Sequence, residues 1–260
     1  MSVTAANITS LRASLAGGAN PQKRVPLGFK DADACLKGGL PCGALHEIFA
    51  DPSHEAAASA FTAALAFRLA AKKRVLWIRQ DFSALEFGEL AATGLLELGL
   101  DPARFLVLRL SDVTDILRAA CDALSCAALG AVVMEFAGEP KILDLVASRR
   151  LTLACTHKGV TAFLLRFNAK PEASAAETRW LIRSAMACQV VARAAGEDWG
   201  RPVFETQLLR NRHGGLGRWV MEWNCDDGLF RKADSRAVVS ASGDRPLAAA
   251  VEGAASRYVA

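Results

Sequence analysis

The chain has 260 residues, which is enough for one domain with a full hydrophobic core. Hydrophobic residues make up 52% of it, yet no apolar run approaches the roughly 20 residues that a membrane-spanning helix needs. The formal net charge of +4 permits contact with nucleic acid without requiring it, and the first ten residues lack a secretory signal pattern. We therefore expect a cytoplasmic protein, neither secreted nor embedded in a membrane.

The cysteines and histidines give no sign of a metal site. The seven cysteines form no CxxC pair, which favours reduced thiols over a disulfide framework or a zinc site. His46 and His54 are each followed by Glu, like the start of a metalloprotease helix. Ala50 and Ala58 stand where the second histidine is required. We expect no bound metal and no cofactor.

The two ends of the chain differ in character from its middle. A short amphipathic pattern covers Ile8 to Leu15, and the segment Gly17 to Pro21 has the composition of a linker. The end of the chain is small, polar and weakly patterned, which is typical of disorder. We therefore divide the chain into an N-terminal helix and linker (1–26), a core domain (27–228) and a disordered tail (229–260).

Within the core, strand and helix patterns alternate. The predicted strands are Leu45–Phe49, Arg74–Arg79, Phe105–Leu108, Ala131–Phe136 and Ala162–Phe167. The predicted helices are Glu55–Ala71, Ser83–Leu98 (ended by Gly99), Val113–Ala128 and Lys141–His157. Such alternation predicts a parallel sheet covered by helices on both faces.

The pattern changes after residue 177. Three strand-like segments follow with no helix between them: Thr178–Val191, Val203–Arg210 and Gly217–Asn224. Asn211–Gly215 has the composition of a hairpin loop. The sequence therefore predicts an α/β fold in which a mostly parallel sheet, flanked by helices, ends in antiparallel strands.

The junction between the first core strand and its helix stands where a nucleotide-binding α/β protein carries its phosphate loop. That loop reads G-x-x-x-x-G-K-[ST]: backbone N–H groups surround the phosphates, Lys neutralises them and Ser/Thr binds magnesium. Here the eight positions are Ala50, Asp51, Pro52, Ser53, His54, Glu55, Ala56 and Ala57. None of the defining residues is present, so we expect no nucleotide binding at these positions.

The replacements also oppose phosphate binding. Asp51-Pro52 is a favourable pair for the cap and first position of a helix, so we expect the Asp51 carboxylate to occupy the free N–H groups. Glu55 adds a second negative charge, and a polyphosphate would meet two carboxylates and no cation. Taken alone, the junction is equally compatible with an ordinary helix start that never bound phosphate.

Several stretches resemble RecA, in the same order along the chain. They are Leu27–Ile48 with its Gly38-Gly39-Leu40-Pro41 turn, Leu98–Leu106, the Cys121–Leu124 helix, the Ala131–Phe136 strand and Leu209–Arg212. The last of these, Leu209-Arg210-Asn211-Arg212, is similar to RecA's paired cations around an Asn. The resemblance covers about Leu27 to Asn224. It implies a RecA-like core.

Within this superfamily the chain is most similar to the ImuA group, damage-inducible mutagenesis accessory proteins related to RecA and to SulA. The similarity lies in the degraded phosphate loop, in the Ser148–Leu151 helix that leads through Gly159 to a strand, and in the strand start Glu177–Trp180. It implies a role in error-prone translesion synthesis under the SOS response. The implied partners are an ImuB-like protein related to Y-family polymerases, an error-prone C-family DNA polymerase, and RecA itself.

The chain departs from RecA at both DNA-binding loops. After the fourth core strand, Ala137–Pro140 alone precedes the next helix, and the second loop is reduced to about Asn168–Glu177, with Lys170 as its cation. We therefore expect DNA contact to be weak or indirect.

The residues for ATP hydrolysis are altered as well. Glu135 resembles the magnesium-holding Asp of RecA, but it has no phosphate loop to serve. Gln80 and Asp81 stand where RecA has its catalytic Glu. We expect no ATPase activity and assign no catalytic residue.

Arg210 and Arg212 are the candidate partner-binding residues. The resemblance places them where RecA cations reach the neighbouring subunit's nucleotide, which implies an interface with RecA or a similar partner. The alternative is a solvated hairpin edge, where cations discourage aggregation.

Three functions follow from these observations: a non-catalytic adaptor in a damage-induced polymerase complex, a SulA-like division inhibitor, and a residual ATPase. The third requires cations near Asp51, and none lies nearby in the sequence.

Overall fold

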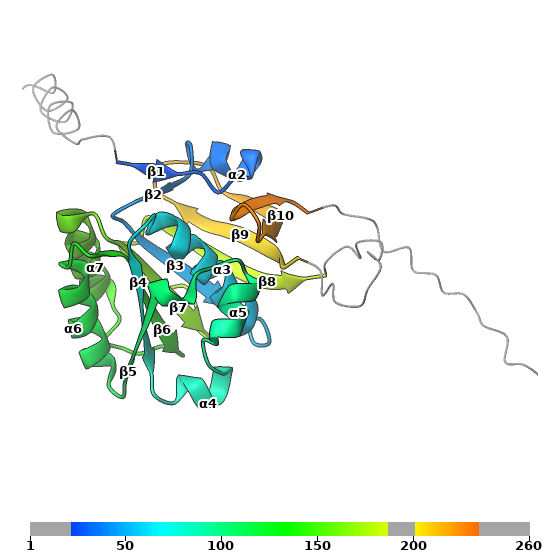
Figure 1. The fold of residues 1–260 in the computed structure, drawn as a ribbon. Helices are drawn as coiled ribbons and strands as arrows, with labels where there is room; N and C mark the ends of the chain where they lie inside the picture. The colour runs from blue at the N-terminus through cyan, green and yellow to red at the C-terminus, as the bar shows by residue number, and fades with distance from the viewer. Residues whose placement is uncertain (1–21, 187–200, 234–260) are drawn as a thin grey trace, which may run out of the picture.

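The computed structural model describes residues 22–186 and 201–233, and within them nine strands form one central sheet (Figure 1). These strands are, in chain order, β3 (Leu45–Ala50), β4 (Arg74–Gln80), β5 (Phe105–Leu110), β6 (Leu129–Ala137), β7 (Thr161–Phe167), β8 (Thr178–Ala185), β9 (Val203–Asn211), β10 (Gly217–Asn224) and β11 (Leu229–Lys232). Their order across the sheet is β11-β10-β9-β8-β3-β7-β6-β4-β5.

The sheet is parallel from β8 to β5 and antiparallel from β8 to β11. Strands β3 and β7 lie in the parallel part and are buried along their whole length. This arrangement confirms the predicted α/β class, with a mostly parallel sheet flanked by helices and antiparallel strands at its C-terminal end.

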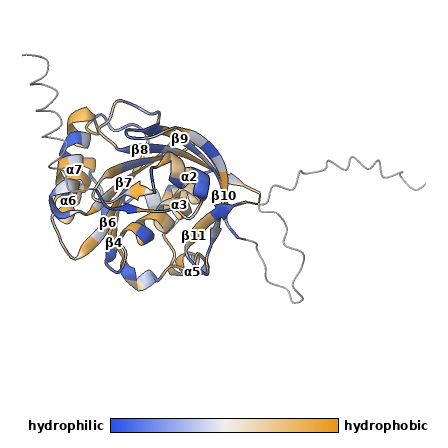
Figure 2. Cartoon of the chain, turned by 90° about the horizontal axis from the view of Figure 1, so that it is seen from above, coloured by the Kyte–Doolittle hydropathy of each residue, from blue (hydrophilic) through white to orange (hydrophobic). Residues whose placement is uncertain are grey.

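Helices cover both faces of the sheet. On one face lie α3 (Glu55–Leu69), α4 (Ser83–Phe87) and α5 (Ala92–Glu97), and on the other α6 (Val113–Leu124) and α7 (Leu145–Lys158); a 3-10 turn, η1 (Pro102–Arg104), precedes β5. The hydropathy colouring in Figure 2 shows apolar residues on the sheet between these layers. Among the described residues, no helix is both long and apolar enough to cross a membrane.

The central helix α3 packs close to the sheet because its sequence is rich in alanine. At the end of this helix, a Cβ added to Gly130 of β6 would lie 2.5 Å from the Cα of Ala70. Any larger residue at position 130 would therefore push the helix and the strand apart.

Two predicted helices differ from those observed. The predicted helix Ser83–Leu98 is two short helices, because Gly88 adopts a left-handed conformation with φ of 77° and interrupts it. The helix predicted from Lys141 begins at Leu145, because the Asp144 side chain accepts the Ala147 N–H at 2.8 Å and caps the helix there.

The core domain extends beyond its predicted limits. At its start, β1 (Arg24–Val25) pairs with β2 (Leu40–Pro41), and α2 (Lys30–Cys35) lies between them. At its end, β11 lies within the predicted tail, and it forms because Phe230 is buried against Trp223 and Phe61. The predicted N-terminal helix, the rest of the tail and residues 187–200 lie outside the described residues.

Candidate functional site

The segment that replaces the phosphate loop joins the carboxyl end of β3 to the amino end of α3, as the sequence predicts. It lies at the edge where the parallel strands end, which is the edge at which open α/β sheets bind their ligands. Ser53 adopts a left-handed conformation with φ of 72° in this segment. The segment thus has the place of a phosphate loop without its glycines or its lysine.

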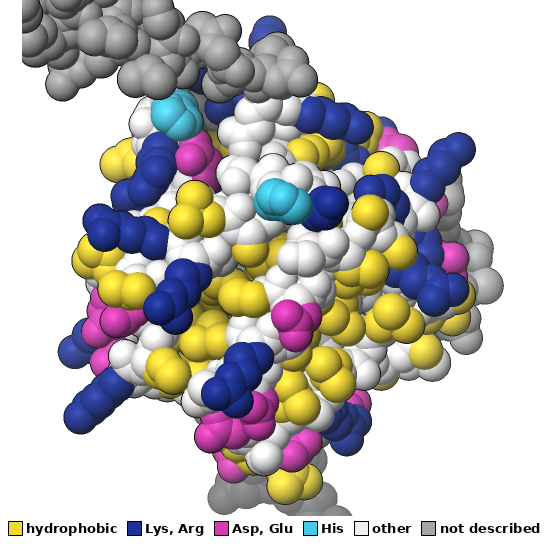
Figure 3. Space-filling model, turned by 90° about the vertical axis from the view of Figure 1, so that its left-hand side faces the viewer, with side chains coloured by type: hydrophobic (Ala, Val, Ile, Leu, Met, Phe, Trp, Pro, Cys, Tyr) yellow, Lys and Arg dark blue, Asp and Glu magenta, His cyan; other side chains and the backbone are white. Residues whose placement is uncertain are grey.

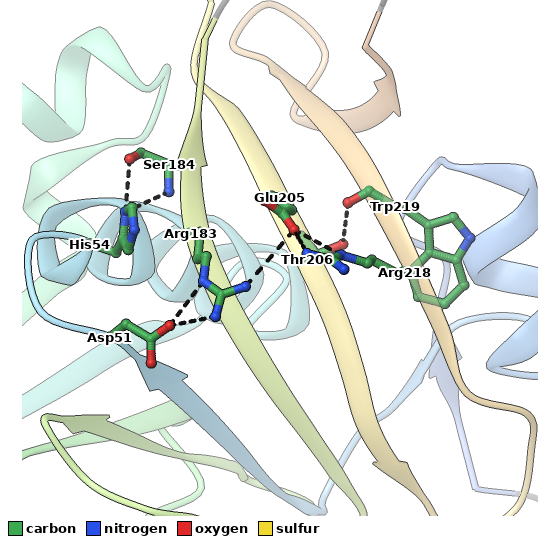
Figure 4. A network of polar contacts seen from close by, with 8 residues as sticks. All are labelled: Asp51, His54, Arg183, Ser184, Glu205, Thr206, Arg218 and Trp219. Atoms are coloured by element: carbon green, nitrogen blue, oxygen red, sulfur yellow. Dashed lines mark hydrogen bonds and ion pairs between the residues drawn. The ribbon is translucent and has the colours of Figure 1, made fainter.

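The prediction that Asp51 caps α3 is wrong. The residue that precedes the helix is His54, and Asp51 Oδ2 instead accepts hydrogen bonds from Arg183 Nε and Nη2, at 2.9 and 2.6 Å (Figure 4). The cause is the parallel pairing of β3 with β8, in which Ala50 lies opposite Ile182. The next residues of the two strands, Asp51 and Arg183, are therefore neighbours.

Arg183 also corrects the expectation that no cation lies near this loop. Its charge is nevertheless committed to carboxylates, because it pairs with Asp51 and its Nη1 lies 4.0 Å from Glu205 on β9. Glu205 in turn pairs with Arg218 on β10, and Figure 4 shows these side chains as one polar network across three strands. A phosphate would have to displace Asp51 to reach this guanidinium.

His54 makes a second connection between the loop and β8. Its Nδ1 lies 2.9 Å from Ser184 Oγ and accepts the Ser184 backbone N–H at 3.2 Å. The loop is therefore attached to β8 at two successive residues, 183 and 184.

Glu135, which the sequence resemblance places at RecA's magnesium ligand, is buried near the end of β6. Its Oε2 accepts the Trp77 indole N–H and its Oε1 accepts Arg79 Nη2, each at 2.8 Å. The side chains of Arg79 and Glu135 are both only 3% exposed. Both carboxylate oxygens of Glu135 therefore accept a hydrogen bond from a side chain of β4.

Gln80 and Asp81 stand at the end of β4. Gln80 is buried, and its Oε1 lies 3.4 Å from the Ala137 amide nitrogen. Asp81 is exposed, and its backbone N–H donates to the Leu110 carbonyl. A side-chain amide cannot accept a proton as a general base does.

A cavity of about 310 Å³ lies between α3 and the α4–α5 segment, and no sequence pattern predicts it. Ala56, at the position of the phosphate-loop lysine, lies on its wall, and Arg79 and Glu135 also line it. Its other walls are mainly apolar, with Phe87 and Leu95 from the α4–α5 segment. The interruption at Gly88 lets these two short helices form a separate wall instead of one continuous helix.

The two candidate partner-binding arginines lie in different environments. Arg210 is half-buried, and its Nη1 donates to the Ser174 carbonyl at 2.6 Å, so it supports the segment before β8. Arg212 is exposed, and its backbone N–H donates to the Glu177 carbonyl. Of the pair, Arg212 is the residue whose side chain is accessible to a partner.

The two segments that the sequence resemblance aligns with RecA's DNA loops contact each other in the structure. The Lys170 backbone N–H donates to Glu139 Oε1 at 2.8 Å, which joins the second segment to the first. This contact places the Glu139 carboxylate at the backbone of Lys170.

Comparison with known proteins identifies the family. Over 225 residues the chain is 32% identical to protein ImuA from two strains of Caulobacter vibrioides, and the match covers 80% of this chain and 86% of that protein. The chain belongs to the ImuA family. No family model matches the chain.

In this member of the ImuA family, the sequence reasoning missed the two arginines that neutralise the site, Arg183 and Arg79. Each lies within two residues of the carboxyl end of its strand, at the edge of the sheet where the site lies, and that was the available signal. Their partners could not be identified, because the contacts depend on the order of strands in the sheet.

Proposed function

We propose that this protein is a non-catalytic, RecA-like adaptor in SOS-induced, error-prone translesion DNA synthesis. It acts by binding protein partners and does not hydrolyse a nucleotide. The observation that carries the proposal is the Asp51–Arg183 pair, which closes the former phosphate position from within the chain.

The second half of the nucleotide site supports the same proposal. A nucleotide with magnesium would need a carboxylate free to face the metal, but Glu135 accepts hydrogen bonds from Trp77 and Arg79. Breaking the contacts of Glu135 with Arg79 and Trp77 would cost more free energy than the binding of a weakly held metal ion would contribute.

The partners that we propose are an ImuB-like protein, an error-prone C-family DNA polymerase and RecA. They follow from the family, and the accessible Arg212 is our candidate for the contact with a RecA-shaped partner. Contact with DNA is then indirect, through the partners.

We expect no magnesium-dependent binding of ATP at micromolar concentrations. Neither the loop nor Glu135 offers the groups that bind phosphate and metal. Isothermal titration calorimetry of the full chain with ATP and magnesium measures this binding. Asp51→Ala is the informative variant, because it removes the carboxylate that accepts hydrogen bonds from Arg183. Micromolar binding to the unaltered chain would overturn the non-catalytic part of the proposal.

Reversing the charge of Arg212 is expected to weaken partner capture by about tenfold, because a charge at the rim of an interface mainly sets the association rate. The measurement is recovery of polymerase subunits or RecA by the tagged protein from DNA-damaged cells. Lys72→Glu, an equally exposed cation between α3 and β4, is the matched control.

If Arg212→Glu and Lys72→Glu recovered equal amounts of the partners, Arg212 would not be part of the interface. Filamentation on overexpression, with no effect on induced mutagenesis, would instead favour the SulA-like division inhibitor.

A further inference from the structure

A groove between α6 and α7 lies on the face of the sheet opposite α3. It encloses about 600 Å³, and its lining includes Leu117 and Cys121 from α6 and Val146 and Leu151 from α7. The space-filling view of this side shows apolar side chains gathered between cations (Figure 3). The groove is distinct from the remodelled phosphate site.

Large apolar side chains at this groove are exposed to solvent. Ile142 is 45% exposed and Val146 is 52% exposed, and both line the groove. Leu153, further along α7, is 70% exposed. A contiguous apolar surface of this kind marks a place where another segment binds.

The first 21 residues of the chain contain a segment suited to such a groove. Ile8, Leu11 and Leu15 are spaced i, i+3 and i+7, so a helix would place them on one face. A helix of fewer than about 15 residues is marginal alone in water, so this pattern requires an apolar surface to pack on. Arg12 would flank this face, and the groove lining includes charges of both signs, Asp122 and Asp144 with Arg118 and Arg150.

The chain enters the described core beside the C-terminal end of α7. Gln22 Nε2 donates to the Cys42 carbonyl at 2.9 Å, and a Cβ on the next residue, Gly43, would lie 3.0 Å from the Cα of Gly159. Gly159 is the C-cap of α7. The first 21 residues are therefore attached at one end of the groove's own helix.

The distances along α7 match the length of the segment. From Gly159 back to Leu151 is about 12 Å at the rise of an α-helix, and residues 16–21 can span about 20 Å when extended. A helix over Ile8–Leu15 is itself about 12 Å long, which takes it from Leu151 to the start of α7. A linker this short also gives the segment a local concentration of the order of millimolar.

We infer that the segment Ile8–Leu15 docks as a helix in the α6/α7 groove of its own chain, with Ile8, Leu11 and Leu15 against Leu117, Val146 and Leu151. This inference does not depend on the proposed function. The segment that occupies the apolar groove is then part of the same chain.

Cys121 makes the inference testable by cross-linking, because its thiol lies in the groove. In the full chain with Leu11→Cys, oxidation is expected to give a disulfide between position 11 and Cys121, found by peptide mapping of monomeric protein. Burial raises the pKa of the Cys121 thiol, so the oxidation is run at mildly alkaline pH. Ala13→Cys, on the opposite face of the segment, is the matched control and is expected not to form this bond.

A second measurement does not depend on cysteine chemistry. Leu11→Asp is expected to speed amide hydrogen exchange in α6 and in the first half of α7 by about threefold or more, whereas Ala13→Asp leaves it unchanged. Equal exchange in the two variants, or no bond from position 11 to Cys121, would show that the segment does not cover the groove. A bond between two chains would assign the groove to a second copy and overturn docking within one chain.

Discussion

Replacing Glu135 by alanine is expected to lower the free energy of unfolding by about 3–5 kcal/mol. The variant leaves the Arg79 guanidinium, only 3% exposed, in the core without its carboxylate. It also removes the acceptor of the Trp77 indole N–H. The penalty comes from burying an unpaired charge and an unpaired donor, and the native pair itself need contribute little net stability.

Urea unfolding of three variants separates these effects. Arg79→Met combined with Glu135→Leu removes both charges and is expected to cost less than Glu135→Ala alone. Glu89→Ala, whose half-exposed carboxylate lies 3.8 Å from Arg79 Nη1, is the control and is expected to cost under about 1 kcal/mol. If Glu135→Ala were as stable as Glu89→Ala, the buried pair would not be part of the core.

Stability is expected to fall by about 2 kcal/mol between pH 7 and pH 5 because of His46. Burial lowers the pKa of His46 from 6.5 to about 4. Its Nε2 lies 3.0 Å from the Pro41 carbonyl, which can only accept, so Nε2 carries the proton and Nδ1 faces Thr178 Oγ1 at 2.7 Å. The Thr178 hydroxyl also accepts the Trp180 indole N–H, which completes a network built around a neutral ring.

The direction of the change follows from the two pKa values. Between about pH 4 and 6.5 the unfolded chain binds a proton at His46 that the folded chain does not, so acid favours unfolding. The stability is present above pH 6.5 and is lost as the pH falls toward 4.

Urea unfolding at several pH values checks this expectation. His46→Gln keeps a donor for Pro41 but cannot titrate, so its stability should vary less across this window than that of the unaltered chain. His157→Gln, at an exposed position on α7, is the control and should retain the original slope. If His46→Gln retained it too, another group would be responsible.

Much of the fold could be predicted because its signals are local. The apolar run of β6 and the periodicity of α3 are read within one element, and turn residues such as Gly99, with φ of 70°, mark where elements end. The predicted elements were wrong where a single residue interrupts a helix, as Gly88 does. They were also wrong where a side chain is buried by an element that is distant in the sequence. The strand around Phe230 is such a case, because its apolar partners lie on β10 and α3.

The feature that the sequence by itself determined is that no phosphate-loop motif stands between β3 and α3, because that motif is contiguous and Asp51, Glu55 and Ala56 stand at its positions. Only the tertiary structure decided what occupies the site instead. Arg183 is 132 residues from Asp51, and Arg79 is 56 residues from Glu135. These pairs meet because β8 lies beside β3 and β4 beside β6, and strand order in a parallel sheet is not encoded in any short stretch of sequence.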